Sequence, residues 1–348
     1  MLRRARCTTS LQISGTRYLP RPAHWLIDLD DPRQPLGICG TLPQFDDALT
    51  TARRLVCVTE ESFLSESQLQ VKRMTGALGA EVSGVDLSDP MGDNLFSAVQ
   101  AALVEHQVLF FHDQDITPEQ QLAFAKRFGD IHYHPFIKGL DEHPEIIEII
   151  KTETDTKNFG GSWHSDQMFN RRPAMGTMLY AKEVPESGGD TMFASMYAAY
   201  EGLSEGMQAV LEDIRTYNTG DRFKHQGGKT RREVMQGQNS MQVKDPDPNQ
   251  DTEAVHPTIR THPESRRKAL YVGGHTQRFD DMTDAESDGL LTFLREHSVR
   301  PEYTCRFRWK KGSLAFWDNR CTQHFAVDDY AGQRRVMHRI TIAGNEPF

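Results

Sequence analysis

The sequence has few cysteines, and they are scattered along the chain. The five residues are Cys7, Cys39, Cys57, Cys305 and Cys321, and no two of them form a C-x-x-C pair. An odd, unpaired set is typical of a reducing compartment and argues against a zinc site built from cysteines. The sequence also lacks any run of 18 or more apolar residues, so nothing in it predicts a membrane-spanning helix.

A strong charge of one sign is also missing. The chain carries 40 basic and 49 acidic residues among 348, which gives a formal net charge of −9. This balance argues against a nucleic-acid-binding protein, although it allows a local pocket for an anion. The composition is that of a soluble globular protein, and the length fits a single β-rich core with additions.

Acidic residues are absent before Asp28. The leader carries five arginines and resembles a mitochondrial transit peptide, but a disordered leader or a mis-assigned start would have the same composition. We therefore expect residues 1–70 to be a poorly ordered or targeting-like extension and residues 71–348 to form the functional domain. The expected location is the cytoplasm, or the mitochondrion if the leader is a transit peptide.

Short β-prone runs with occasional helices follow residue 71. The amphipathic pattern of Asp93–Glu105 predicts a helix, and the apolar run Val108–Phe111 predicts a buried strand. Thr117 and Thr283 each begin a capping box, which predicts a helix after each of them. These signals predict a mostly β fold with inserted helices.

A long polar stretch interrupts this pattern at about residues 217–257. A loop of that length within a compact domain is usually functional or disordered. We interpret it as a lid insertion that would exclude water from a reactive site, although its composition fits plain disorder nearly as well.

The first chemical signal is the pair His164 and Asp166. On an extended strand, residues two apart point to the same side, so both side chains could bind one metal ion, with the remote His324 as a third ligand. Two histidines and one carboxylate leave other coordination positions open, which is the pattern of non-haem Fe(II) oxygenases. On spacing alone, His132 and His134 in the predicted strand Ile131–Phe136 are a second possible metal pair.

Two arginines follow His324 at +11 and +15. Arg335 and Arg339 lie on the predicted strand Gln333–Ile342, so they share a face and lie roughly 13 Å apart at about 3.3 Å per residue. A buried guanidinium group needs a carboxylate, sulfonate or phosphate partner. The pair would therefore serve two different anionic groups, unless both arginines lie on a solvent-exposed face.

Several sequence blocks occur in the order and spacing of one known family. The blocks are Trp163–Asp166, Gly188–Phe193, Trp317–Arg320 with Gln323 and His324, Asp329–Tyr330, and Arg334–Arg339. From about Met74 to the C-terminus, the chain resembles the taurine dioxygenase family of Fe(II)- and 2-oxoglutarate-dependent oxygenases. That family also includes the aryloxyalkanoate and alkylsulfatase dioxygenases. The resemblance implies a double-stranded β-helix, the jelly-roll, cupin-like core.

The resemblance also assigns roles to individual residues. It makes His164, Asp166 and His324 the iron ligands. It makes Thr191 and Arg335 the residues that hold the distal carboxylate of 2-oxoglutarate. Arg339 and His134 would bind the anionic end of the primary substrate; a satisfied core histidine is the other interpretation of His134.

The activity implied by the resemblance is hydroxylation of a small anionic substrate next to its heteroatom group. The reaction would use Fe(II), 2-oxoglutarate and O2, with ascorbate as an in vitro reductant, and would give succinate, CO2 and sulfite or an equivalent leaving group. An alkylsulfonate such as taurine, a sulfate ester or an aryloxyalkanoate would suit it.

Two positions bear on the choice of substrate. Taurine-specific members have Tyr and Asn where this chain has Ile137 and Gly160, which favours an alkyl- or aryl-substituted anion over taurine. No nucleic-acid or membrane partner is expected. A homo-oligomer, a dimer or tetramer, is expected because the family's members commonly form one.

Two other functions are compatible with the same ligands. Two histidines and an aspartate also suit a zinc-dependent hydrolase, but no H-E-x-x-H motif or similar glutamate adjoins them to act as a general base. A metal-binding jelly-roll module without enzymatic activity is the other alternative, because a fold does not fix a function. Thr191 and the two arginines favour a cosubstrate and so favour the oxygenase.

Overall fold

A computed structural model of the protein describes residues 69–221, 233, 240–245 and 250–348. The predicted N-terminal extension, except for its last two residues, and much of the predicted lid lie outside these ranges. No helix among the described residues is long and apolar enough to cross a membrane.

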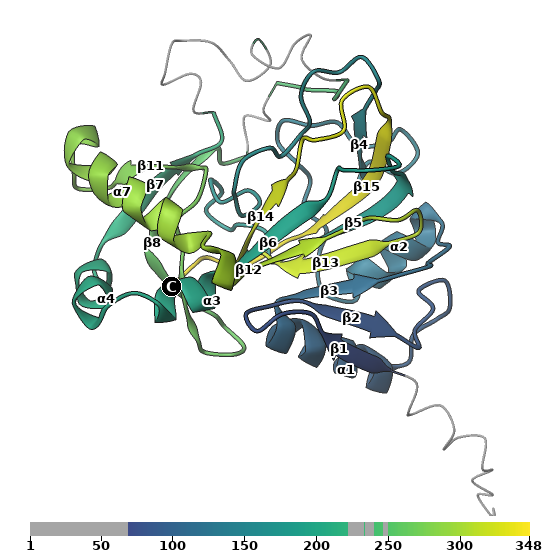
Figure 1. Ribbon diagram of the computed structural model, residues 1–348, viewed down its shortest axis with the longest axis horizontal. Helices are drawn as coiled ribbons and strands as arrows, with labels where there is room; N and C mark the ends of the chain where they lie inside the picture. The colour runs from purple at the N-terminus through teal and green to yellow at the C-terminus, as the bar shows by residue number, and fades with distance from the viewer. Residues whose placement is uncertain (1–68, 222–232, 234–239, 246–249) are drawn as a thin grey trace, which may run out of the picture. The chain divides into compact units, whose positions relative to one another are not determined.

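A seven-stranded sheet forms the larger half of the core (Figure 1). In order across the sheet its strands are β1 (Gln70–Arg73), β2 (Ala80–Ser83), β3 (Val108–Phe111), β13 (Leu314–Asp318), β5 (Gly176–Glu183), β15 (Arg335–Ile342) and β4 (Ile147–Lys151). Neighbouring strands are antiparallel except β2 and β3. Strands far apart in the sequence therefore lie side by side, as expected for a jelly roll.

A three-stranded sheet faces the inner side of the large one. It consists of β12 (Thr304–Phe307), β6 (Thr191–Ser195) and β14 (Thr322–Ala326), all antiparallel. Phe193 of β6 packs against Phe110 of β3 and Trp317 of β13, with ring centroids 5.5 Å apart in both pairs. Aromatic rings from both sheets therefore fill the space between them, and the predicted jelly-roll core is confirmed.

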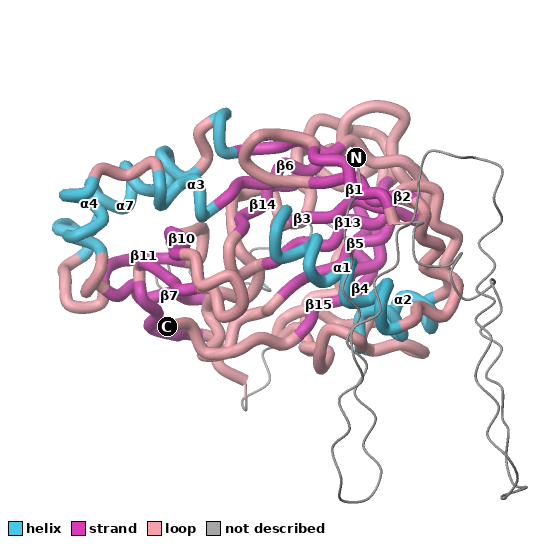
Figure 2. The backbone as a smooth tube through the Cα atoms, turned by 90° about the horizontal axis from the view of Figure 1, so that it is seen from below, coloured by secondary structure: helices cyan, strands magenta, loops and turns pink. Residues whose placement is uncertain are grey.

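The alternation of side chains along the strands decides which residues face this interior. Leu179 of β5 and Trp317 of β13 belong to the inner core, whereas Met178 and Phe316, one position away, belong to the outer core. The helices α1 (Asp93–His106) and α2 (Pro118–Lys126) cover that outer face (Figure 2). On β15, Met337 belongs to the inner core, so Arg335 and Arg339, each two residues away, share its side.

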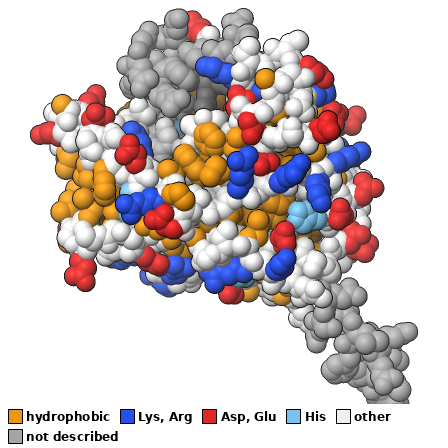
Figure 3. Space-filling model, viewed as in Figure 1, with side chains coloured by type: hydrophobic (Ala, Val, Ile, Leu, Met, Phe, Trp, Pro, Cys, Tyr) orange, Lys and Arg blue, Asp and Glu red, His pale blue; other side chains and the backbone are white. Residues whose placement is uncertain are grey.

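A second layer of elements packs beyond the small sheet. It contains β7 (Arg215–Thr219), β8 (Glu253–Pro257), β9 (Ile259–Thr261), β10 (Lys268–Leu270) and β11 (Thr276–Phe279), with the helices α3 (Met196–Glu201), α4 (Glu205–Leu211) and α7 (Asp284–Ser298) and the 3-10 turn η2 (Pro301–Tyr303). Residues of α3, β10 and α7 share one apolar cluster that includes Leu270 and Leu294. Figure 3 shows acidic and basic side chains intermixed over the described surface that faces the viewer.

Most of the predicted elements occur where the sequence placed them. Both predicted capping boxes are present, at Thr117 before α2 and at Thr283 before α7. The predicted strand Ile131–Phe136 is wrong, because only Ile131 pairs, in an isolated bridge with Ile342. The predicted loop at residues 217–257 is wrong at both ends, where β7 and β8 pair with each other and continue the regular structure.

Candidate metal centre and cosubstrate pocket

Three side chains from two distant parts of the chain converge between the two sheets. An isolated antiparallel bridge joins His164 to His324 of β14, with N to O distances of 3.1 and 2.9 Å. The Nε2 atom of His164 lies 3.7 Å from Oδ1 of Asp166, and that of His324 lies 3.8 Å from the same oxygen. The three residues predicted as ligands therefore present their donor atoms to one point.

The position of Asp166 differs from the prediction in one respect. Residues 164–166 do not form an extended strand, because only His164 pairs and Asp166 begins a turn. The turn is held by Asn319, whose Oδ1 accepts from the backbone N–H of Asp166 at 3.1 Å. Thr177 of β5 donates its hydroxyl to Oδ2 of Asp166 at 2.7 Å and accepts from Nδ2 of Asn319. These two neighbours, which sequence reasoning did not single out, fix the carboxylate.

The protonation states suit a divalent metal. The Nδ1 atom of His164 lies 2.6 Å from the carbonyl oxygen of Ser162, so Nδ1 carries the proton and Nε2 offers its lone pair. Burial alone would raise the pKa of Asp166, but the guanidinium group of Arg339, with the hydrogen bond from Thr177, brings it below its usual range. Burial, reinforced by His164, lowers the pKa of His324. Neutral imidazoles beside an ionised carboxylate are what metal binding requires, so these residues fit an Fe(II) ion.

A narrow pocket opens beside the three predicted ligands. Its polar lining consists of His164, Thr191, His324, Arg335 and Arg339. Its apolar lining consists of Ile149, Phe159, Leu179, Trp317 and Ala326. The two arginines predicted to share a face of β15 thus both reach this pocket, rather than solvent.

The two guanidinium groups lack enough partners. Both side chains are buried, and Nε and Nη2 of each have no hydrogen-bond partner among the described residues. Nη2 of Arg339 lies 2.8 Å from Oδ1 of Asp166, close enough for an ion pair but outside hydrogen-bond geometry. Burial lowers the pKa of Arg335, and Tyr330 and Asp190 offset only part of this effect. Buried cations in this state are stabilised by anions, so both guanidinium groups are suited to bind an anion.

The glycine pair before β6 allows the chain to turn tightly beside Asp329 and Arg335. Gly188 and Gly189 both have positive φ values, 79° and 69°. A Cβ at Gly188 would lie 2.6 Å from Oδ1 of Asp329, and one at Gly189 would lie 3.4 Å from Cδ of Arg335. Only glycine fits such a turn without strain, which explains this block of the sequence.

His134 does not line this pocket. It lies in a separate depression that Tyr133, Lys138 and Lys244 also line, and its Nδ1 accepts from the backbone N–H of Phe136 at 3.1 Å. His132 and His134, a possible metal pair on spacing alone, belong to no group of three or more potential metal ligands among the described residues. Burial, with a contribution from Arg339, lowers the pKa of His132.

The two positions predicted to influence the choice of substrate lie in different places. Gly160 lines the pocket, and a Cβ there would lie 3.5 Å from Cε1 of His164. Ile137 is buried in a small apolar cluster with Ile147 and Met241. Gly160 is therefore the position of the two that adjoins the ligands.

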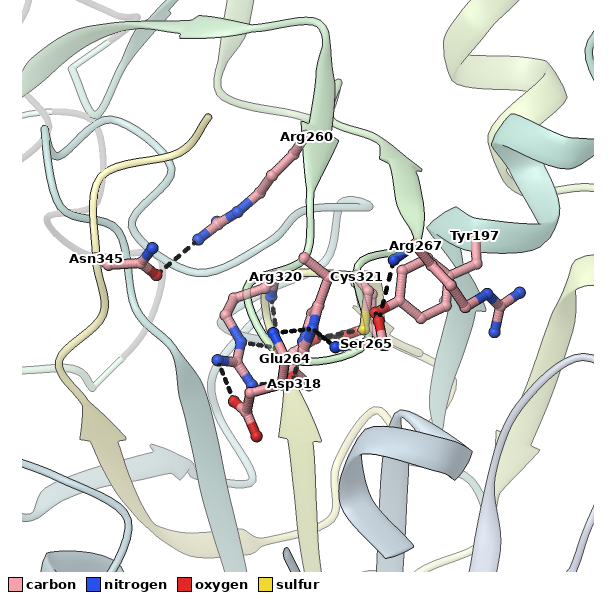
Figure 4. Close-up of polar contacts among 11 residues, drawn as sticks. Tyr197, Arg260, Glu264, Ser265, Arg267, Asp318, Arg320, Cys321 and Asn345 are labelled. Atoms are coloured by element: carbon pink, nitrogen blue, oxygen red, sulfur yellow. Dashed lines mark hydrogen bonds and ion pairs between the residues drawn. The ribbon is translucent and has the colours of Figure 1, made fainter. Parts of the chain in front are cut away.

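A second group of potential ligands, His262, Asp318 and Cys321, serves a structural purpose (Figure 4). Arg320 binds both carboxylate oxygens of Asp318, at 2.9 and 2.6 Å, and Nε2 of His262 lies 3.0 Å from one of them. Arg320 also donates to Glu264 at 2.7 Å. Because the carboxylate is fully engaged, the cluster braces the turn from β13 to β14 that delivers His324.

The jelly roll, the two-histidine, one-carboxylate centre and the adjoining anion pocket define a non-haem metal oxygenase. Comparison with known proteins agrees. The family described as taurine catabolism dioxygenase TauD, TfdA family, matches residues 70–341. The chain belongs to this family.

Individual relatives cover most of the chain. It is 34% identical over 278 residues to an alkylsulfatase of Acinetobacter baylyi, covering 80% of this chain and 86% of that one. It is 34% identical over 281 residues to an alpha-ketoglutarate-dependent sulfate ester dioxygenase of Pseudomonas putida, covering 80% and 91%. A solved taurine dioxygenase of Burkholderia xenovorans superposes with a TM-score of 0.67 at 32% identity, covering 80% and 92%.

The protein is therefore a 2-oxoglutarate-dependent dioxygenase. Its family uses Fe(II), 2-oxoglutarate and O2. This membership disfavours both the zinc hydrolase and the non-enzymatic module that the sequence left open.

Proposed function

We propose that the protein hydroxylates a small anionic organic substrate next to its heteroatom group, giving succinate, CO2 and a released sulfite, sulfate or equivalent. In this proposal His164, Asp166 and His324 hold Fe(II). Thr191 and Arg335 hold the distal carboxylate of 2-oxoglutarate, and Arg339 binds the anionic end of the substrate. The observation that carries it is the pair of buried, incompletely partnered arginines on the wall beside the three ligands.

The bound iron would supply the activation of dioxygen, and the protein would supply geometry and electrostatics. Thr177 and Asn319 hold Asp166 in place. Arg339, which faces Asp166 in the structure, can turn its N–H groups to a substrate anion because metal binding neutralises the carboxylate. The apolar walls exclude water, which strengthens these interactions.

Alkyl sulfate esters are the substrate class that the pocket suits best. Ile149, Phe159 and Ala326 offer an apolar wall to an alkyl body, and Arg339 offers a guanidinium group to a sulfate. Gly160 brings no side chain to hydrogen-bond the ammonium of taurine. Two relatives named for alkylsulfatase and sulfate ester activity support the same class.

His134 is proposed as a second donor to the substrate anion. Because its Nδ1 accepts a backbone N–H, its proton is on Nε2, which makes Nε2 a hydrogen-bond donor. Its side chain lines a depression separate from the pocket, so a substrate that contacts both Arg339 and His134 would have to be longer than taurine.

The test is succinate formation by purified protein with Fe(II), 2-oxoglutarate, oxygen and ascorbate as reductant. The substrate panel contains alkyl sulfates of increasing length, alkanesulfonates including taurine, and aryloxyalkanoates. We expect the fastest turnover with alkyl sulfates, with one sulfate released per succinate. Coupled turnover of another class would replace the substrate assignment, and a protein that makes no succinate while metal is bound would contradict the dioxygenase mechanism.

Location and assembly complete the proposal. We propose a cytoplasmic enzyme that forms a homo-oligomer, a dimer or tetramer. The two described cysteines, Cys305 and Cys321, are buried and free, which suits a reducing compartment.

A further inference from the structure

Trp309 lies two residues beyond β12 and contacts both residues assigned to the cosubstrate. Its indole N–H donates to Oγ1 of Thr191 at 2.9 Å. Its ring lies 5.7 Å from Cζ of Arg335. The side chain is buried, and its edge packs on the ring of Phe307 with centroids 4.9 Å apart. Packing in the interior therefore fixes the position of the indole.

The hydrogen bond to Thr191 has a direction. An indole nitrogen can only donate, whereas a threonine hydroxyl has one proton to donate and two lone pairs to accept. Trp309 occupies one lone pair, and the hydroxyl proton of Thr191 donates to no acceptor among the described residues. The indole therefore turns this hydroxyl into a donor whose proton is available to an anion.

The same indole supports the neighbouring cation. Arg335 is buried, its Nε and Nη2 have no hydrogen-bond partner among the described residues, and its Cζ lies over the Trp309 ring. A cation beside an indole face is attracted by the ring quadrupole. One side chain thus orients a neutral donor and a charged donor toward the same space.

We propose that Trp309 is a positioning residue for the cosubstrate, selecting 2-oxo acids that carry a distal carboxylate by holding the Thr191 hydroxyl as a donor. This inference rests on the proposed function, in which Thr191 and Arg335 bind that carboxylate. Trp309 itself needs no contact with the cosubstrate.

The test compares two ligands in the wild type and a Trp309→Phe variant. The variant keeps an aromatic ring and removes the N–H. Calorimetry on Mn(II)-loaded, oxygen-free protein gives the Kd of 2-oxoglutarate and of 2-oxopentanoate, which has the same carbon chain without the distal carboxylate. We expect the Kd of 2-oxoglutarate to rise about tenfold and that of 2-oxopentanoate to stay unchanged, because a hydrogen bond to a charged group is affected.

Two further variants make the outcome specific. Thr191→Val should raise the Kd of 2-oxoglutarate to a similar degree, and Trp309→Phe should add little in that background. Trp163→Phe is the matched control, because this indole packs on Phe325 rather than on Thr191, and the Kd should not change.

The results distinguish a wrong role for Trp309 from a wrong cosubstrate site. A Kd that rises in Thr191→Val but not in Trp309→Phe overturns the role of Trp309. Equal weakening of both ligands in Trp309→Phe also overturns it, because general damage to the pocket would then be the cause. If neither Thr191→Val nor Arg335→Ala weakens 2-oxoglutarate, the proposed cosubstrate site itself is wrong.

Discussion

Several individual side chains of the site lie around one carboxylate group, that of Asp166. Asp166 is buried, faces the Nε2 atoms of both histidines and lies 2.8 Å from Arg339. Arg339 and the hydrogen bond from Thr177 maintain its charge against the effect of burial. The metal site and the proposed substrate anion point are thus coupled through a single residue.

Asp166→Asn keeps the shape of this residue and removes its charge. We expect Fe(II) affinity to fall by about 100-fold or more and turnover to be lost, because even changes behind metal ligands cost up to about that factor. Thr177→Val, which removes the hydrogen bond behind the carboxylate, should cost about tenfold. Metal titration and a succinate assay measure both; an active Asp166→Asn or His164→Ala enzyme would refute the ligand assignment.

Substitutions of the two arginines should affect the KM values of different ligands. Arg335→Ala should raise the KM for 2-oxoglutarate by about 10- to 100-fold with a small effect on the KM for substrate, because charge-assisted hydrogen bonds are lost. Arg339→Ala should do the reverse. Steady-state kinetics with each ligand varied in turn gives the ratio, and an inverted ratio would mean that the two roles are exchanged.

Among the elements, the turn from β13 to β14 positions more than one residue of the site. It presents Asn319 to the Asp166 backbone and leads directly into His324. Its geometry is held by the buried pair of Asp318 and Arg320 rather than by exposed contacts. The sequence block Trp317–Arg320 is therefore structural support for a ligand, and none of the four residues is itself predicted to bind metal.

Asp318→Asn tests this support. It leaves Arg320 buried without its counter-charge, so we expect unfolding to become easier by about 3–5 kcal/mol. Glu201→Gln, which breaks the exposed ion pair with Arg267, should cost less than about 1 kcal/mol. Denaturant unfolding gives both values, and an Asp318→Asn protein as stable as the Glu201→Gln control would contradict the bracing role.

At the scale of the whole molecule, buried neutral histidines make the fold sensitive to acid. His256 of β8 is buried, and burial lowers its pKa from 6.5 to about 4, while its Nε2 donates to the carbonyl of Asn170. In the unfolded chain the same residue binds a proton near pH 6.5. Between these values the unfolded state holds more protons, so stability falls as the pH drops from 6.5 to 4.

The contribution of His256 can be isolated. As the pH falls from 7 to 5, the low pKa of His256 in the folded state should reduce the free energy of unfolding by about 2 kcal/mol. Unfolding free energies of the wild type and of His256→Asn at the two pH values should therefore differ in their pH dependence by about that amount, because the other histidines are shared. Parallel pH dependence in the two proteins would show that His256 is not held neutral in the fold.

Much of the site could be read from residue types and spacing. The three predicted ligands, the two arginines and the capping boxes at Thr117 and Thr283 depend on local periodicity or on ordered sequence blocks. The structure brings the predicted ligands and both arginines together, but not His134. Spacing also placed Arg335 and Arg339 correctly on one face, because the period of a strand is fixed at two residues.

The tertiary structure decided what spacing could not. Asp166 lies in a turn held by Asn319, 153 residues further along the chain, and His134 lies in a depression of its own. The contact of Trp309 with Thr191 joins positions 118 residues apart. Such contacts arise from the pairing of distant strands, whose register depends on the packing of the whole core, so no local pattern contains them.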